Sequence, residues 1–124
     1  MRSAGAALLL AVVVVTAVDA DEDFLEGPEI RSLIAGQVTT GFSDRGRFWT
    51  EWHTGGSYCH RLLVNDPDLP CFAKGRWWID GDLRCARPTT ATWQYCRRIQ
   101  RTGPNAYRSF TSDGALTETW SVAR

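Results

Sequence analysis

The side chains best suited to chemistry in this chain are two histidines, four cysteines and a few carboxylates. Glu51 and His53 alternate onto one face of a predicted strand, and a histidine–carboxylate pair can transfer protons in acid–base catalysis. No recognisable motif attaches a nucleophile to this pair or to His60, and the chain holds no phosphate loop or dinucleotide fingerprint. We therefore predict no catalytic residues. The alternative, an enzyme, requires a cleft that combines His53 or His60 with a carboxylate.

The four cysteines indicate two disulfides, and four cysteines can pair in three ways. The local pairing, Cys59 with Cys71 and Cys85 with Cys96, closes two loops of similar length and is the one that we favour. Each bond would stabilise the fold by about 3 kcal/mol in the chain-entropy model. The alternative is a zinc site that uses Cys59, His60, Cys71 and a further cysteine. Because the chain has no Cys-x-x-Cys pair, we predict neither a metal nor another cofactor.

Glu118 is the carboxylate with the most unusual neighbours. Leu116 and Trp120, each two residues away, place it on the inward face of a predicted strand. A buried carboxylate needs a cationic partner, and we expect an arginine between Arg97 and Arg108 to supply it. A ligand contact is the alternative role for this residue.

Tryptophan is abundant, with six residues in the chain, and core packing is its ordinary use. Trp77 and Trp78 are adjacent and must point to opposite faces of a strand, as must Trp49 and its neighbour Phe48. An exposed tryptophan beside arginines would be the best surface for binding. The candidate binding residues are therefore Trp49, Trp78, Glu118, Arg97 and Arg98.

Charge is balanced overall, with 14 basic and 14 acidic residues, but it is not evenly distributed. Acidic residues gather between Asp21 and Glu29, whereas the segment from Arg84 to Arg108 holds six arginines and no acid. The arginines indicate either an anionic partner, or contact with the acidic arm, or a solvated face, which we favour. A zero net charge in an exported chain argues against nucleic acid as a partner.

Residues 1–20 have the layout of a secretory signal, with Arg2, an apolar run, and small residues at Val18 and Ala20 before the expected cleavage. The apolar run is shorter than the ~20 residues of a membrane span, although an uncleaved anchor is the alternative. We predict an acidic lead-in over 21–27, a single β-domain over 28–124, and a periplasmic or secreted monomer with no membrane span after cleavage.

The remaining pattern predicts one short helix followed by eight short strands. Pro28 suits the first turn of the helix, Ile30, Leu33 and Ile34 share one face, and Gly36 can end it. The strands are expected over 37–42, 47–53, 58–64, 72–79, 83–87, 92–101, 106–111 and 115–122, separated by turn residues. We therefore predict an all-β, antiparallel up-and-down meander that forms a barrel or half-barrel, with a two-sheet sandwich as the alternative.

The stretch from Gly75 to Cys96 is the centre of this prediction. Its pattern predicts three strands with turns at Asp80-Gly81 and Pro88, and a disulfide between Cys85 and Cys96 would join the second and third strands. Its four aromatic residues are expected to supply much of the core; they are Trp77, Trp78, Trp93 and Tyr95.

These features resemble small exported bacterial β-proteins of unknown function. The resemblance covers most of Ile30 to Trp120 and rests on the helix ending at Gly36, the Gly-x-Trp strand at Gly75–Trp77, the Gly-Asp-Leu-x-Cys step at Gly81–Cys85 and the second cysteine, Cys96. Cys59 and Cys71 look like an addition to that pattern. Architecture alone gives a weaker similarity to lipocalin-like and avidin-like barrels and to small periplasmic inhibitors of hydrolases. The resemblance implies a fold and a compartment and supplies no catalytic residue.

Two classes of function follow. The first is a non-enzymatic exported binding or envelope-associated module, whose partner is a protein or a small apolar or aromatic ligand. The second is an inhibitor of a secreted or periplasmic hydrolase, which would present the loop at Asn65–Pro70 or at Pro88–Ala91, held by its disulfide.

Overall fold

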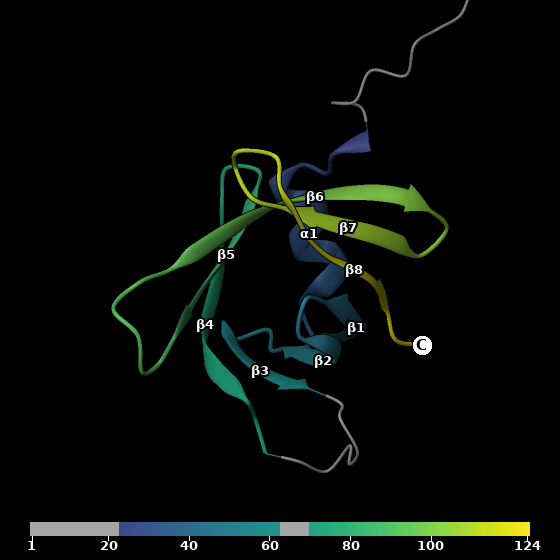
Figure 1. Ribbon diagram of the computed structural model, residues 1–124. Helices are drawn as coiled ribbons and strands as arrows, with labels where there is room; N and C mark the ends of the chain where they lie inside the picture. Colours follow the sequence, from purple (N-terminus) through teal and green to yellow (C-terminus); the bar gives the residue numbers. More distant parts are fainter. Residues whose placement is uncertain (1–22, 63–69) are drawn as a thin grey trace, which may run out of the picture.

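The chain folds into a closed barrel of eight strands in which every neighbouring pair is antiparallel (Figure 1). The computed structural model describes residues 23–62 and 70–124. Successive strands pair along the chain, and β1 closes the ring by pairing with β8. The strands are β1 Gln37–Ser43, β2 Gly46–Trp52, β3 Ser57–Leu62, β4 Ala73–Asp80, β5 Leu83–Pro88, β6 Tyr95–Gly103, β7 Ala106–Phe110 and β8 Leu116–Val122. The predicted up-and-down barrel is confirmed, and the sandwich alternative is wrong.

One helix, α1 (Gly27–Ile34), packs against one end of the barrel. The Glu26 backbone N–H donates to the Glu29 side chain at 3.0 Å, which fixes the first turn. Ile30 and Ile34 are fully buried, because their spacing places them on the same face of the helix. In the view of Figure 1, α1 overlaps the ring of strands, and its contacts are with β1, β4 and β5. The short helix is thus stabilised by the strands that it covers.

The two ends of the barrel differ in composition. In an up-and-down barrel alternate turns lie at the same end, so the β2–β3, β4–β5 and β6–β7 turns share the end with α1. This end is packed with apolar side chains, including Trp52 and Trp77, whose rings meet edge to face at 5.7 Å. The opposite end, formed by the β1–β2, β3–β4, β5–β6 and β7–β8 connections, is called the mouth.

Both predicted disulfides are present. Cys59 pairs with Cys71 and Cys85 with Cys96, as expected from their spacing. Cys85 and Cys96 are directly opposite each other on β5 and β6, with their Cα atoms 4.0 Å apart. The second bond therefore fixes the register of these two strands, and with it the direction of the residues on either side.

The segment before the helix lies against β6. Phe24 forms an isolated bridge with Gln100, and the Leu25 N–H donates to the Ile99 carbonyl at 2.8 Å. Phe24 also contacts the guanidinium of Arg98, which lies 3.9 Å from the ring centroid. This part of the lead-in thus folds onto the arginine-rich strand of its own chain. The expected signal at 1–20 lies outside the described residues.

Two expectations about aromatic and apolar residues are wrong. Trp93 was expected in the core but is 59% exposed, because β6 begins at Tyr95 and leaves Trp93 in the preceding loop. Leu116 was expected to point inward but is 54% exposed, since the register shifts between Ser109 and Phe110 near the end of the ladder. Leu116 begins β8 at the mouth, and Trp93 lies in the β5–β6 connection at the same end. No helix within the described part of the chain is long and apolar enough to cross a membrane.

Candidate functional site

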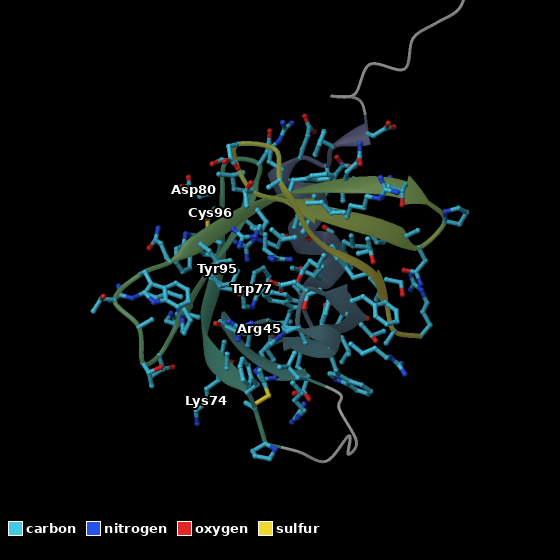
Figure 2. The ribbon with its side chains drawn as sticks, viewed as in Figure 1. Arg45, Lys74, Trp77, Asp80, Tyr95 and Cys96 are labelled. Carbon is cyan, nitrogen blue, oxygen red and sulfur yellow. A yellow bond between two sulfur atoms is a disulfide. The ribbon has the colours of Figure 1, made fainter. Side chains whose placement is uncertain are left out.

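The mouth of the barrel holds a cavity of about 300 Å³, which we call the mouth cavity. Its volume lies at the lower end of the range for small-molecule sites, about 300–1,000 Å³. Figure 2 shows Arg45 and Tyr95 within the ring of strands and Lys74 outside it. The described residues that line the cavity are Ser43, Asp44, Arg45, Thr50, Trp52, Tyr58, His60, Phe72, Ala73, Arg84, Pro88, Trp93, Tyr95, Arg97, Thr117 and Glu118. The lining is both aromatic and charged.

Arg84 and Glu118 form an ion pair in the barrel interior. Arg84 Nη1 lies 3.5 Å from Glu118 Oε1, and the two side chains are 4% and 19% exposed. This separation is longer than the ~2.7–2.9 Å of a strong charge-assisted hydrogen bond. The guanidinium also lies over the Trp52 ring, 4.8 Å from its centroid. The Nε atom of Arg84 is buried without a hydrogen-bond partner among the described residues, so the protein satisfies this cation only in part.

Glu118 is held in place by neighbouring strands. Ser109 lies opposite it on β7, and the Ser109 hydroxyl donates to Glu118 Oε1 at 3.2 Å. The same hydroxyl oxygen accepts a hydrogen bond from Trp120 Nε1 at 2.8 Å. Because Ser109 and Trp120 are buried, this chain of hydrogen bonds fixes the carboxylate from the side of the packed core.

A second arginine faces the same cavity. Arg97 on β6 is the direct partner of Arg84 on β5, and its guanidinium lies 4.8 Å from the centroid of the Tyr95 ring. Arg97 Nη1 donates to the Cys96 carbonyl at 3.0 Å. Burial lowers the pKa of Arg97, and the charge on Arg84 lowers it further. Two cations therefore meet on one inner wall of the barrel.

The opposite wall carries groups that are neutral at pH 7. Thr50 Oγ1 lies 2.7 Å from His60 Nδ1, and burial lowers the pKa of His60 below its usual value, so the imidazole is uncharged. Burial is also the main cause of a raised pKa at Tyr58, with a smaller effect of Tyr95. The Tyr58 hydroxyl lies next to Tyr95 but has no hydrogen bond of good geometry to any described residue. This wall adds polarity without charge.

Two exposed aromatic residues flank the opening. Phe72 is 56% exposed and lies near His60, with ring centroids 6.5 Å apart. Trp93, on the β5–β6 connection, is 6.2 Å from the Tyr95 ring. Exposed aromatic side chains at the edge of a concave site are typical of surfaces that bind a partner or ligand.

The structure brings together two of the five candidate binding residues. Glu118 and Arg97 line the mouth cavity. Trp49, Trp78 and Arg98 alternate with inward-facing neighbours and lie on the outer surface of β2, β4 and β6. The structure thus offers no single surface that unites all five. The inward direction predicted for Glu118 is correct, but the predicted partner between Arg97 and Arg108 is wrong, because the ion pair is with Arg84.

The histidine–carboxylate pair lies outside the cavity. His53 Nε2 is 3.3 Å from Glu51 Oε1, and Arg61 pairs with the second Glu51 oxygen. The hydrogen bond from Arg61 is the main reason why the pKa of Glu51 lies below its usual value. His53, the residue after β2, is half exposed, so the pair that it forms with Glu51 lies on the outside of the barrel.

Sequence reasoning missed Arg84 as a site residue, although a signal for it exists. Cysteines joined directly across neighbouring strands share one face, and each flanking residue then points the other way. Once Cys85 is paired with Cys96, Arg84 and Arg97 must lie together on the opposite face. Several other residues that line the mouth cavity were not among the candidate binding residues; they are Thr50, Tyr58, His60, Phe72, Trp93 and Tyr95.

Comparisons of the chain with protein-family models, with curated proteins and with solved structures gave no match. The resemblance to exported bacterial β-proteins therefore stays a prediction. Within the described residues, no group of three or more His, Cys, Asp or Glu side chains is placed to hold a metal ion. The charged groups of the inner cavity are the buried Arg84, the partly buried Arg97 and Glu118; Asp44 and Arg45 lie on the exposed β1–β2 turn, and aromatic rings supply much of the remaining lining.

Proposed function

We propose that this protein is an exported, non-enzymatic binding protein that holds a small organic molecule in the mouth cavity. The observation that carries the proposal is the contrast between the two barrel ends: one is closed by α1 and apolar packing, and the other encloses about 300 Å³ lined by aromatic rings. Concave sites with aromatic walls and a few converging polar groups are the usual form of ligand pockets. The protein acts as a monomer and without a cofactor.

Two observations support export. Residues 1–20 have the composition of a secretory signal, and the chain forms two disulfides, which persist in oxidising compartments and are rare in the cytosol. The test is N-terminal sequencing and thiol counting on the exported protein. Cleavage after Ala20 with all four sulfurs oxidised is expected. Free thiols in exported material would contradict the assignment.

Ligand binding is tested by a nuclear magnetic resonance screen of small fragments against the oxidised, ¹⁵N-labelled protein. Trp52 and Trp93 line the mouth cavity, whereas Trp78 lies on the outer surface. We expect aromatic fragments to shift the indole signals of Trp52 and Trp93 and to leave Trp78 unchanged. The proposal fails if no fragment of any charge moves the cavity signals selectively.

A hydrolase inhibitor is the second candidate, and the β5–β6 connection favours it. The Thr89 N–H donates to the Lys74 carbonyl at 2.8 Å, and Arg87 Nε donates to the Ala91 carbonyl at 3.3 Å. This loop also ends at the Cys85–Cys96 bond and presents exposed Trp93. A rigid loop binds with a small entropic cost. The other predicted inhibitory loop, Asn65–Pro70, lies outside the described residues except for Pro70.

The inhibitor candidate is tested with a panel of secreted proteases and of lysozymes. Stoichiometric inhibition that is lost in Thr90→Arg, which places a bulky charge on the exposed turn, is the expected result for an inhibitor. A matched Gly55→Ala variant, altered at the other end of the barrel, is the control. Absence of inhibition across the panel leaves the small-ligand function as the better supported one.

A further inference from the structure

We infer that the ligand of the mouth cavity is a small aromatic monocarboxylate, whose carboxylate binds between Arg84 and Arg97. This inference rests on the proposed function and adds the charge and the size of the ligand. The expectation from sequence was an apolar or aromatic ligand, and the structure adds the requirement for an anionic group.

The first step is the count of charges around the cavity. Among its described lining residues, the arginines are Arg45, Arg84 and Arg97, and the acidic residues are Asp44 and Glu118. Arg45 and Asp44 are adjacent, exposed residues of the β1–β2 turn, so their charges cancel in this count, and the Arg45 guanidinium lies 5.4 Å from the centroid of the Phe72 ring. Deeper in the cavity, two guanidiniums face one carboxylate, so a single positive charge is uncompensated. A ligand with one negative charge restores neutrality, which favours a carboxylate over a phosphate monoester of higher charge.

The second step is the geometry of the two arginines. Arg84 and Arg97 are directly opposite each other on neighbouring strands, an arrangement that destabilises a sheet when the charges are alike. Arg84 is almost fully buried, its ion pair with Glu118 is long at 3.5 Å, and its Nε has no partner among the described residues. A buried guanidinium in this state is costly unless an anion completes its hydrogen bonds. The two cations are thus arranged for an anion that arrives from the mouth.

The third step concerns the body of the ligand. Five aromatic residues line the cavity, namely Trp52, Tyr58, Phe72, Trp93 and Tyr95. Three of them already carry a guanidinium over their faces: Arg84 lies over Trp52, Arg45 over Phe72 and Arg97 over Tyr95. Flat rings favour stacking with a flat apolar group. The cavity of about 300 Å³ limits that group to one or two rings.

The test uses matched acids and amides. Cinnamate with cinnamamide, and indole-3-acetate with indole-3-acetamide, differ mainly in charge, and calorimetry at pH 7 measures the affinity of each for the oxidised protein. We expect the acids to bind at least about tenfold more tightly than the amides, because a charge-assisted hydrogen bond is lost with the charge. Equal affinities, or binding of the amides alone, overturn the anionic assignment and leave the general ligand-binding function standing. Absence of binding by every probe overturns the aromatic-monocarboxylate assignment, and the fragment screen then decides the wider function separately.

Variants locate the carboxylate. Arg84→Met and Arg97→Met keep an unbranched apolar stem but remove the guanidinium, and they are expected to weaken cinnamate binding by about tenfold or more. Arg108→Met, on the exposed outer face of β7, is the matched control and should leave binding unchanged. Arg97→Met is also expected to retain thermal stability because it removes a like-charge contact, so its loss of affinity does not depend on unfolding. Binding that survives both cavity variants overturns the assignment.

Glu118→Gln gives a result of opposite sign. Removing the carboxylate leaves two positive charges in the cavity, so cinnamate should bind several-fold more tightly although the fold itself is weakened. Damage to the structure would lower affinity, which makes tighter binding specific to the charge mechanism. Weaker cinnamate binding by folded Glu118→Gln contradicts the inference.

Discussion

Arg84 and Glu118 meet inside the barrel at 3.5 Å, although they come from β5 and β8, three strands apart around the ring. Each is tied to a tryptophan: Arg84 lies over Trp52, and Glu118 is linked through Ser109 to Trp120. The ion pair therefore connects the packed end of the barrel to the open cavity. A stronger Arg84–Glu118 interaction stabilises the fold and leaves less positive charge on Arg84 available to a ligand.

Loss of the Glu118 charge is expected to destabilise the protein. In Glu118→Gln the Arg84 guanidinium stays buried without its counter-charge, and we expect the free energy of unfolding to fall by about 1–3 kcal/mol. Glu51→Gln is the matched control, since Glu51 pairs with Arg61 and His53 on the outer surface, where ion pairs contribute less than about 1 kcal/mol. Urea unfolding at pH 7 measures both variants. Equal losses would show that the inner pair has no special energetic role.

The two disulfides should contribute similar amounts to stability. Their sequence separations are 12 for Cys59–Cys71 and 11 for Cys85–Cys96, so the chain-entropy model assigns about 3 kcal/mol to each. Replacing each pair with alanines and comparing midpoints of chemical unfolding tests this. Cys85 is fully buried, so its replacement also removes packing and should cost somewhat more. A double-pair variant that keeps wild-type stability would contradict the role of both bonds.

The sequence carried most of the information about the barrel and less about its site. Turn residues such as Asp80-Gly81 separate the strands clearly, and the short spacings of the cysteines pointed to the correct pairs. The sequence pattern predicts that β6 starts at Thr92, but the strand starts three residues later, at Tyr95, so the core position predicted for Trp93 is wrong. Strand ends are poorly specified when both candidate residues are aromatic or β-branched.

The direction of Arg84 depends on register rather than on local pattern. Trp77 and Trp78 are both plausible core residues, and the choice between them decides whether Arg84 points inward across the β4–β5 pairing. The sequence contains no local preference that settles this choice. Trp77 is buried, its indole N–H donating to the His53 carbonyl at 2.9 Å, and Ala86 opposite it also faces inward. Arg84 is two residues from Ala86 on the same strand, so its side chain points inward as well.

Gly27 is expected to be intolerant of a larger residue. A Cβ atom at this position would lie 2.1 Å from the Gly81 carbonyl oxygen, because the helix start packs directly on the β4–β5 turn. The Gly27 N–H also donates to Asp82 at 2.8 Å and holds the two segments together. We expect Gly27→Ala to lower the free energy of unfolding by about 1–3 kcal/mol. Gly55→Ala, where the added atom meets nothing within 4 Å, is the control, and equal stability of the two variants would contradict the close approach.

Acidification below pH 6.5 should weaken the fold through His60. Burial lowers the pKa of this imidazole in the folded state, so the unfolded chain binds a proton first as the pH falls. Stability is therefore complete above about pH 6.5 and declines as the pH falls toward the folded-state pKa of His60. The interactions that lower the pKa of Glu51 also stabilise the fold, and their contribution is lost only below the usual carboxyl pKa of 4.5. The loss of stability caused by His60 therefore occurs at a higher pH than the loss caused by Glu51.

The measurement is chemical unfolding of wild type and His60→Gln between pH 7.5 and pH 5. Wild type should lose stability across this range, whereas the variant should show a flatter profile because its amide does not titrate. Glutamine can keep a polar contact with Thr50, which lies 2.7 Å from His60 Nδ1, and this limits the loss of structure. If the two proteins lose stability equally as the pH falls, the acid sensitivity belongs to another group. The assignment of a neutral His60 imidazole in the cavity would then be unsupported.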